Sequence, residues 1–510
     1  MTSEPGGAAR PHPREYRSLG DVAEHLGVPC TWADAVDDCA VTGIGQDSRV
    51  VGAGEIYAAL PGANHHGASF ASEAATRGAV AVVSDRPCAV LPTFVVDDPR
   101  RVVGPLAAWL YGDPSHQLDV FGVTGTNGKT STSYLLEAGL TAAGRRSGLL
   151  SGVTVRGPRS ARQAMRTTPE ASELQQTLSA FRSQGVRAVA LEVSSHALAL
   201  HRVDGIRFRA GIFTNLGPDH LDFHRDLDGY YSAKARLFAP ERSESAIIGI
   251  DDDYGKRLAA EVEIPHCTFS TRSAAADFYA DNIRADEDAT SFVAHWPGGR
   301  AAVRLRLLGL HQVDNALGAI AALWTAGVDL GTVIAGMENL DCVPGRMQRV
   351  DLGQPFLAFV DYMHNTAGQH RQFPFLRSLT TGRIIVVVGA TGDRDPSKRR
   401  PLGWTAATFA DIVIITDESP FSEDPAELRR HIALGAWAAE HAAVILEPER
   451  ADAIGRAVDL AQPGDVIAGR GHDPVQTFGT ATRTFDDKAE LCKALDRRSV
   501  ARRPAERTLT

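Results

Sequence analysis

The stretch from Val123 to Ser131, with the sequence VTGTNGKTS, holds the residues whose types and spacing most clearly suggest chemistry. Its glycines allow backbone N–H groups to face phosphate oxygens, and the start of the expected helix adds partial positive charge. Lys129 can reach the β- and γ-phosphates of a nucleotide, and the Thr130 hydroxyl can bind Mg²⁺. The usual pattern has glycine where this chain has Val123. The alternative is an ordinary strand–turn–helix corner, but such a corner does not need Lys-Thr after Gly128.

Two further polar segments follow predicted buried strands. Glu192 comes directly after the apolar run 188–191, and Asp219-His220 follow the run 210–213. Because ligands collect at the carboxyl ends of parallel strands, both segments are expected near the phosphate loop. Glu192 could complete a Mg²⁺ site, or it could cap a neighbouring helix. By spacing alone, His220 is as readily a structural histidine as a ligand.

A third polar segment, Thr167-Thr168-Pro169, precedes a helical pattern over 170–182. Thr168 suits the N-cap and Pro169 suits the first helical turn. This capping role explains the residues fully. Hydroxyl groups facing a phosphate or carboxylate near the helix start would explain them equally well, as they would Ser48 after another short strand.

Short apolar runs alternate with helical patterns along the whole chain, which predicts an α/β protein. A chain of 510 residues exceeds what one hydrophobic core usually serves, so three domains are expected. The predicted units are a tail at 1–17, an N-terminal domain at 18–118, a central domain at 119–344, a C-terminal domain at 345–497 and a tail at 498–510. The phosphate loop opens the central domain, whose sheet should be parallel.

Composition excludes several function classes. The net charge is −9 and the basic residues are dispersed, which argues against a nucleic-acid partner. The six cysteines lack the paired spacing of a zinc or redox site and fit reduced thiols of the cytoplasm. The first 17 residues lack the apolar segment of a signal peptide, and no run of eighteen apolar residues occurs. We therefore expect a cytoplasmic monomer with small-molecule substrates and no membrane partner.

Taken together, the motifs resemble those of the Mur ligases, and most closely those of the MurE-type members. The resemblance extends from about Leu19 to Lys493. Nine segments occur in the order seen in that family: Gly125–Thr130, Thr167–Pro169, Glu192–His196, Asp219–Asp222, Tyr231–Phe238, Pro344–Arg346, Asp361–His364, Gly392–Asp395 and Gly469–His472.

This resemblance implies a UDP-sugar-binding N-terminal domain, a central P-loop ATPase with a parallel sheet, and a C-terminal Rossmann-like domain. The implied reaction transfers the γ-phosphoryl group of ATP to a carboxylate of UDP-N-acetylmuramoyl-L-Ala-D-Glu. An amino acid then attacks the acyl phosphate to form an amide. The implied cofactors are ATP, two Mg²⁺ ions and a carbamylated Lys234.

The resemblance also implies roles for individual residues. The implied nucleotide contacts are Gly125, Thr126, Asn127, Gly128, Lys129, Thr130, Ser131, Asn315, Arg346, Asp361 and His364. The implied metal ligands are Thr130 and Glu192 for one ion and His220 for the other, with Lys234 near the second. Lys129, Glu192, His220 and Lys234 form the implied catalytic set. The implied substrate contacts are Ser48, Thr167, Thr168, Ser194 and Arg202 for the UDP-muramoyl group, Arg394 for the carboxylate of the amino acid, and Glu418, Ser419, Phe421, Gly469 and Asp473 around its amine.

Two departures from the family pattern concern the amino acid. Members that add meso-diaminopimelate carry Asp-Asn-Pro-Arg, in which the Arg binds the distal carboxylate; this chain has Glu418-Ser-Pro-Phe421. Asp473 stands where Glu is usual. Without a cation at Phe421, a distal carboxylate lacks its bidentate partner. We therefore expect an amine other than meso-diaminopimelate: lysine, another basic residue, or a smaller apolar amino acid.

Further departures leave two alternatives open. His311-Gln312 stand where Phe-Asn is common, Met363 and Thr366 replace Ala and Pro, and Leu200 replaces a Gln near the UDP-sugar. One alternative is a related amide ligase of specialised metabolism that acts on a non-muramoyl acid. The other is a nucleotide-binding protein without turnover, against which the joint presence of Lys129 and the other catalytic residues argues.

Overall fold

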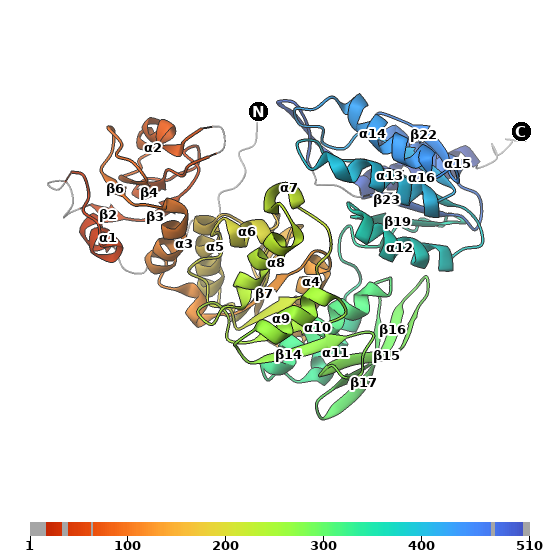
Figure 1. The fold of residues 1–510 in the computed structure, drawn as a ribbon, viewed down its shortest axis with the longest axis horizontal. Coiled ribbons are helices and arrows are strands. Elements are labelled where there is room, and N and C mark those ends of the chain that lie inside the picture. Colours follow the sequence, from red (N-terminus) through yellow and green to blue (C-terminus); the bar gives the residue numbers. More distant parts are fainter. Residues whose placement is uncertain (1–16, 33–38, 63–64, 471–474, 503–510) are drawn as a thin grey trace, which may run out of the picture.

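The structure, a computed structural model, describes residues 17–32, 39–62, 65–470 and 475–502. It contains three α/β units that follow one another along the chain (Figure 1). Within these ranges, no helix combines the length and the apolar character needed to cross a membrane.

The N-terminal unit is built on a parallel four-stranded sheet in the order β3-β4-β5-β6. The side chains of β4 and β5 are entirely buried, and α3 packs over the sheet. Its elements are β1 (Arg17–Ser18), α1 (Leu19–Leu26), β2 (Ala40–Val41), β3 (Gly43–Gly45), β4 (Glu55–Ala58), η2 (Gly67–Phe70), α2 (Ala71–Thr76), β5 (Ala81–Ser84), β6 (Thr93–Val95), α3 (Pro99–Leu110) and η3 (Pro114–Gln117).

The central unit contains an eleven-stranded sheet in the order β10-β9-β8-β11-β7-β12-β13-β14-β15-β16-β17. Strands β8 to β15 in this order are parallel, and antiparallel pairs extend both edges. Its strands are β7 (Asp119–Thr124), β8 (Ser147–Leu150), β9 (Thr154–Gly157), β10 (Ser160–Gln163), β11 (Ala188–Glu192), β12 (Ala210–Phe213), β13 (Ala246–Gly249), β14 (His266–Ser270), β15 (Phe278–Ala285), β16 (Thr290–Trp296) and β17 (Gly299–Leu305).

Helices cover both faces of this sheet, so its middle strands are uninterrupted apolar runs. Helices α4, α10 and α11 bury one face, whereas α5, α8 and α9 bury the other. The helices are α4 (Lys129–Ala142), α5 (Ala171–Ser183), α6 (Ser195–Ala199), α7 (Leu221–His224), α8 (Leu227–Ala235), η4 (Arg236–Phe238), α9 (Asp253–Glu261), α10 (His311–Thr325) and α11 (Leu330–Glu338).

The C-terminal unit has a six-stranded sheet in the order β18-β19-β23-β20-β21-β22, parallel except for β18. Its elements are β18 (Gln348–Arg349), β19 (Leu357–Asp361), α12 (Thr366–Ser378), β20 (Ile384–Val388), η5 (Pro396–Lys398), α13 (Arg399–Phe409), β21 (Ile412–Ile415), α14 (Pro425–Ala438), β22 (Ala443–Leu446), α15 (Arg450–Leu460), β23 (Val466–Arg470), β24 (Val475–Phe478), β25 (Ala481–Thr484) and α16 (Asp487–Arg502).

The predicted fold class, a three-domain α/β protein with a central parallel sheet, is confirmed. One local prediction is wrong, because Thr168 is not a helix N-cap. Helix α5 begins at Ala171 with Glu170 as its N-cap. The Thr168 hydroxyl instead bonds to the backbone at the end of β11, where it donates to the Glu192 carbonyl at 2.8 Å and accepts from the Ser194 N–H at 3.0 Å.

Candidate active site

The loop between β7 and α4 lies at the carboxyl edge of the central sheet, as the sequence predicts. Gly125 has φ +145° and a Cβ there would lie 1.9 Å from the Thr214 hydroxyl oxygen, so only glycine fits. Gly128 has φ +93°, and a Cβ there would lie 2.3 Å from Asn315 Oδ1. Thr126 and Asn127 complete the turn.

The loop is held by the segment that follows β12. The Thr126 N–H donates to the Asn215 carbonyl at 2.8 Å, and the Asn127 N–H donates to the Asn215 side chain at 3.1 Å. The Thr214 hydroxyl donates to the Asn127 carbonyl at 2.6 Å. These bonds fix the loop backbone before any ligand binds.

Lys129 begins α4 and folds back over the loop. Its ammonium donates to the Gly125 carbonyl at 2.9 Å and to the Thr126 carbonyl at 3.0 Å. Burial lowers the pKa of Lys129, although the carboxylates of Glu192 and Asp219 oppose that shift. Thr130 and Ser131 follow in the first turn and are buried.

Glu192 is the last residue of β11 and is 1% exposed. Burial raises its pKa, while the charge of Lys129 and a 2.7 Å bond from the Gly152 N–H favour the carboxylate. A hydrogen bond with Thr130 also lowers the pKa of Glu192. Glu192 and Thr130 are therefore adjacent, as their implied metal would require.

Lys234 lies in α8 and is 1% exposed. Its Nζ donates to the Gly125 carbonyl at 2.8 Å, the same oxygen that Lys129 contacts. It also lies 4.5 Å from the centre of the Tyr230 ring. Burial, with the charge of Lys129, lowers the pKa of Lys234 well below its ordinary value. This environment favours the neutral amine.

His220 precedes α7 with a left-handed backbone, φ +53°. Its ring meets His196 edge-on at 4.8 Å between centroids. Burial lowers the pKa of His220 to about 3 despite the neighbouring Asp219 carboxylate. The imidazole is therefore neutral at pH 7, which is the form that binds a metal.

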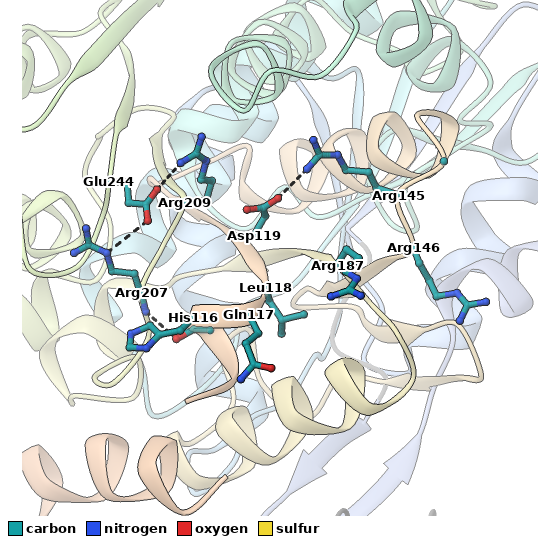
Figure 2. A pocket seen from close by; sticks show the side chains of 12 residues that line it. His116, Gln117, Leu118, Asp119, Arg145, Arg146, Arg187, Arg207, Arg209 and Glu244 are labelled. Atoms are coloured by element: carbon teal, nitrogen blue, oxygen red, sulfur yellow. Dashed lines mark hydrogen bonds and ion pairs between the residues drawn. The ribbon is translucent and has the colours of Figure 1, made fainter. Parts of the chain in front are cut away.

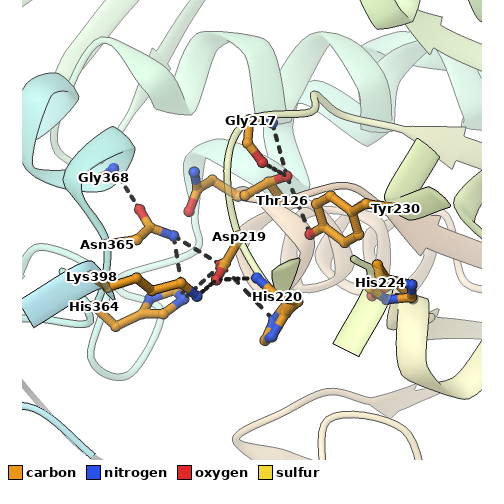
Figure 3. Close-up of polar contacts among 12 residues, drawn as sticks. Thr126, Gly217, Asp219, His220, His224, Tyr230, His364, Asn365, Gly368 and Lys398 are labelled. Atoms are coloured by element: carbon orange, nitrogen blue, oxygen red, sulfur yellow. Dashed lines mark hydrogen bonds and ion pairs between the residues drawn. The ribbon is translucent and has the colours of Figure 1, made fainter. Parts of the chain in front are cut away.

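Asp219 joins the central unit to the C-terminal unit (Figure 3). Its carboxylate accepts a bond from Asn365 Nδ2 at 3.1 Å and lies 3.4 Å from His364 Nε2. Lys398 Nζ forms an ion pair with the other oxygen. Burial opposes ionisation of Asp219, but the bond and charge of His364, aided by nearby cations, lower its pKa.

Of three other residues implied to contact the nucleotide, Arg346 and Asn315 contact the start of α4, and Asp361 lies at the end of β19. Arg346 Nη2 donates to the Thr130 hydroxyl at 3.0 Å. Asn315, on α10, accepts a 3.4 Å bond from the Thr132 hydroxyl. Asp361 ends β19, accepts from the Met347 N–H at 2.7 Å, and has its pKa raised to about 6 by burial.

Most of the residues implied to contact the UDP-muramoyl group lie close together, but one lies apart from the others. Arg202 is half-buried, forms a 2.8 Å ion pair with Glu170, and donates to the Thr168 carbonyl at 3.4 Å. Ser194 caps α6 and lies 3.3 Å from the Thr168 hydroxyl. Thr167 is adjacent in the chain. Ser48 lies apart from this group, in the N-terminal unit, where it donates to Glu73 at 2.6 Å.

Residues implied to bind the amino acid lie in the C-terminal unit. Arg394 is exposed, and its charge helps to lower the pKa of His196 to about 4, after burial and the charge of His224. Arg394 therefore lies close enough to His196 of the central unit for its charge to act there. Gly469 lies within β23, and Asp473 falls outside the described residues.

The segment after β21 forms a turn that is held on several sides. Glu418 is buried and accepts a 2.7 Å bond from the Thr391 hydroxyl. The Ser419 carbonyl accepts from the Gly392 N–H at 2.8 Å. Phe421 has a left-handed backbone, φ +52°, and its N–H donates to the Thr477 carbonyl at 3.1 Å.

The donor set fits magnesium bound through a nucleotide better than an all-protein cage. Among the described residues, no three His, Cys, Asp or Glu side chains converge to hold a metal. Mg²⁺ commonly takes one or two carboxylates and completes its shell with phosphate oxygens and waters. Glu192 beside the Thr130 hydroxyl supplies that kind of partial site.

The contacts of Asp219 with Asn365 and Lys398 could not be predicted from the sequence. Asp219 lies beside His220 in the chain, and the motif implies a role for His220 alone. Its partners are 146 and 179 residues away in the chain. No spacing pattern could have paired them.

Comparisons with known proteins place this site in a family. Three family models match: the Mur ligase family catalytic domain over 40–106, the Mur ligase middle domain over 123–323, and the Mur ligase glutamate ligase domain over 345–471. The UDP-N-acetylmuramoyl-L-alanyl-D-glutamate–2,6-diaminopimelate ligase of Streptomyces coelicolor is 42% identical over 502 residues, covering 96% of this chain and 98% of that protein. The enzyme of the same name from Corynebacterium glutamicum is 43% identical over 490 residues, covering 92% and 94%.

Solved structures agree. A structure of a 2,6-diaminopimelate ligase of this kind has a TM-score of 0.66 and 28% identity, covering 95% of this chain and all of that one. MurF from Acinetobacter baumannii shares the fold, with a TM-score of 0.67 at 20% identity over 90% of this chain and 96% of that one. The chain belongs to the Mur ligase family, whose members form amide bonds with ATP and release ADP.

Proposed function

We propose that this chain is a ligase that adds an amino acid to UDP-N-acetylmuramoyl-L-Ala-D-Glu through an acyl phosphate. The observation that carries the proposal is the convergence of Lys129, Glu192 and Lys234 on the loop from Gly125 to Thr130. The acceptor follows from relatives of this length and identity that are named for it.

In this proposal the loop N–H groups and Lys129 bind the phosphates of ATP. Asn315 lies beside the loop, and Arg346, Asp361 and His364 bring the C-terminal unit to the nucleotide. Phosphoryl transfer depends on positioning the reactants and on stabilising the negative charge spread over the phosphate oxygens. Lys129 and Arg346 would supply positive charge for this stabilisation. Water must be excluded, because it would hydrolyse the acyl phosphate.

Two Mg²⁺ ions are proposed to neutralise the phosphate charge when bound. Thr130 and Glu192 would hold one, and His220 would hold the other.

Lys234 is proposed to carry a carbamate. If Lys234 were protonated, two ammonium groups would share the buried Gly125 carbonyl, and like charges in a buried site repel strongly. Carbamylation replaces this repulsion with an attractive pair and needs the neutral amine that burial favours. In ¹³C-bicarbonate, NMR should show a carbamate signal that Lys234→Arg lacks. A spectrum without that signal in the unaltered protein contradicts the assignment.

The acceptor is proposed to lie across the central and N-terminal units. Ser48, Thr167, Thr168, Ser194 and Arg202 would contact its UDP-muramoyl group. Their hydroxyls and one cation suit a ligand that carries phosphates and carboxylates.

The amine is proposed not to be meso-diaminopimelate, although the relatives above are named for it. Arg394 would bind the α-carboxylate, and Glu418, Ser419 and Phe421, with Gly469 and Asp473, would surround the side chain. Phe421 offers no cation to a distal carboxylate, whose desolvation would then go uncompensated. A lysine, another basic residue or a smaller apolar amino acid lacks that cost.

An amino-acid screen tests the acceptor and the amine together. ATP, UDP-N-acetylmuramoyl-L-Ala-D-Glu and each amino acid are mixed with the protein, and products are detected by mass. We expect ADP release that depends on this acceptor and favours an amino acid without a distal carboxylate. Phosphate release indifferent to the acceptor would refute the acceptor assignment, and preference for meso-diaminopimelate would refute the amine assignment.

Two variants sharpen this test. Lys129→Met should abolish ADP release, whereas Lys256→Met, which removes an exposed lysine on α9, should not. Phe421→Arg should raise kcat/KM for meso-diaminopimelate relative to lysine by roughly tenfold or more, the value of a charge-assisted bidentate bond. Phe421→Leu is its control and should not.

A further inference from the structure

A cavity of about 840 Å³ lies at the amino ends of the central parallel strands (Figure 2). Asp119 begins β7, Arg187 immediately precedes β11, and Arg209 immediately precedes β12. The phosphate loop follows the carboxyl end of β7. The cavity is therefore at the opposite edge of the sheet from the candidate active site.

Arginine dominates the lining of this cavity. Five guanidinium groups line it, on Arg145, Arg146, Arg187, Arg207 and Arg209, against the carboxylates of Asp119 and Glu244. The lining therefore carries three positive charges in excess. This concentration is unusual for a chain whose net charge is −9.

The two carboxylates engage three of the arginines. Arg145 Nη1 lies 2.8 Å from Asp119 Oδ2. Arg209 Nη1 lies 2.6 Å from Glu244 Oε2, and Arg207 Nε lies 3.8 Å from Glu244 Oε1. These pairs orient the guanidinium groups around the rim and leave most of their N–H donors unused.

Among the residues that the structure describes, the other two arginines have no acidic partner. Arg146 Nη1 donates to the Gln184 carbonyl at 3.1 Å. The exposed Arg187 guanidinium has no hydrogen-bond or ion-pair partner within the ranges that the structure describes (Figure 2). Both therefore offer N–H groups to a ligand.

We propose that this cavity binds an oligophosphate group. Guanidinium groups present fixed forks of donors that match phosphate oxygens, and several spaced around one cavity match a ligand with several anionic groups. The volume lies within the range of small-ligand sites, roughly 300–1,000 Å³. The positive charge is gathered in a cavity rather than along a stripe, which favours a small ligand over a nucleic acid.

Titration calorimetry with inorganic tripolyphosphate tests the proposal. The full chain carries Lys129→Met, so that the phosphate loop contributes little binding. In this background we expect one site. Adding Arg146→Ala and Arg187→Ala should weaken binding by roughly a hundredfold, about tenfold for each charge-assisted bond lost.

Two controls show whether weaker binding comes from loss of the charges in the cavity or from a general effect on net charge or folding. Arg300→Ala with Arg304→Ala, which removes two exposed arginines of β17, should leave the dissociation constant within about twofold of the background, since these residues lie outside the cavity. Arg146→Lys with Arg187→Lys should restore part of the affinity, because it keeps both charges. Both alanine variants should keep ligase activity when Lys129 is intact.

Guanosine triphosphate, titrated in parallel, distinguishes a free oligophosphate from one carried by a nucleotide. The probe that binds more tightly shows whether the natural ligand is a free oligophosphate or a nucleotide. This conclusion requires that Arg146→Ala with Arg187→Ala weakens the binding of that probe. No binding of either probe in the Lys129→Met background, or unchanged binding by that double variant, overturns the proposal.

Discussion

The contact between Asp219 and Lys398 gives a sharp test of whether the C-terminal unit must dock for turnover. We expect Lys398→Met and Asp219→Asn each to reduce kcat/KM for ATP. Both changes keep the side-chain size, and the single amide oxygen of asparagine can still accept one of the two bonds that the carboxylate accepts, from the His220 N–H or from Asn365.

The structure sets the size of this effect. A hydrogen bond to a charged group contributes about 1.5–3 kcal/mol. Asp219 is 2% exposed, but the Lys398 side chain is 31% exposed, so water compensates part of the loss on the lysine side. We therefore take the lower end, about 1.5 kcal/mol, which corresponds to roughly a tenfold reduction.

The measurement is a double-mutant cycle on ADP release at limiting ATP. If the two residues act through each other, the double variant should also be about tenfold slower, not a hundredfold. Lys493→Met, which removes an exposed lysine paired with Glu490, is the matched control and should have no effect. Additive losses, or a Lys398→Met variant as active as the unaltered chain, would show that the contact does not assist turnover.

Three further changes have defined outcomes. Gly125→Ala should destabilise the fold by about 2 kcal/mol or more, because its Cβ would meet Thr214, and calorimetry should show Tm lower by roughly 4–8 °C; an unchanged Tm contradicts this. Lys234→Ala should lose most ligase activity, and depleting bicarbonate should slow the unaltered protein alone; equal slowing of both contradicts the carbamate. Burial raises the pKa of Asp314 from 3.8 to about 6. The free energy of unfolding therefore decreases as the pH rises through that range, because the carboxyl group ionises more readily in the unfolded chain than when it is buried in the folded state. In urea titrations Asp314→Asn should therefore be the more stable protein at pH 8, with the gain vanishing below pH 4; a pH-independent difference contradicts the assigned shift.

Strands that are buried on both faces could be predicted closely from the sequence. The runs at 188–191 and 210–213 fall within β11 and β12, because a fully buried parallel strand is an uninterrupted apolar segment. Strands β15 to β17, which pair antiparallel with one another, could not be predicted from apolar runs. Their side chains alternate between buried and exposed, and β15 mixes aromatic with charged residues, so no apolar run marks them.

The site could be predicted where chemistry and sequence adjacency coincide. Lys129 and Thr130 follow the loop glycines directly, and Glu192 ends a buried strand, so their positions at one sheet edge follow from the topology. The hydrogen bonds of Thr168 could not be predicted, because they join two segments of the chain that only the fold brings together. The same holds for Asp219 and Lys398.

The turn at Phe421 bears on how substrate range diverges within the family. A left-handed phenylalanine costs about 1–3 kcal/mol, so its conformation must be imposed by the surroundings. The Thr477 carbonyl, the Gly479 N–H and the Gly392 N–H hold this turn through main-chain atoms, which do not depend on the side chain at 421. The backbone conformation at Phe421 is thus set by its main-chain hydrogen bonds and does not depend on the side chain at this position. Under the proposed function, a single exchange at this position would change which amino acid is incorporated without altering the backbone around it.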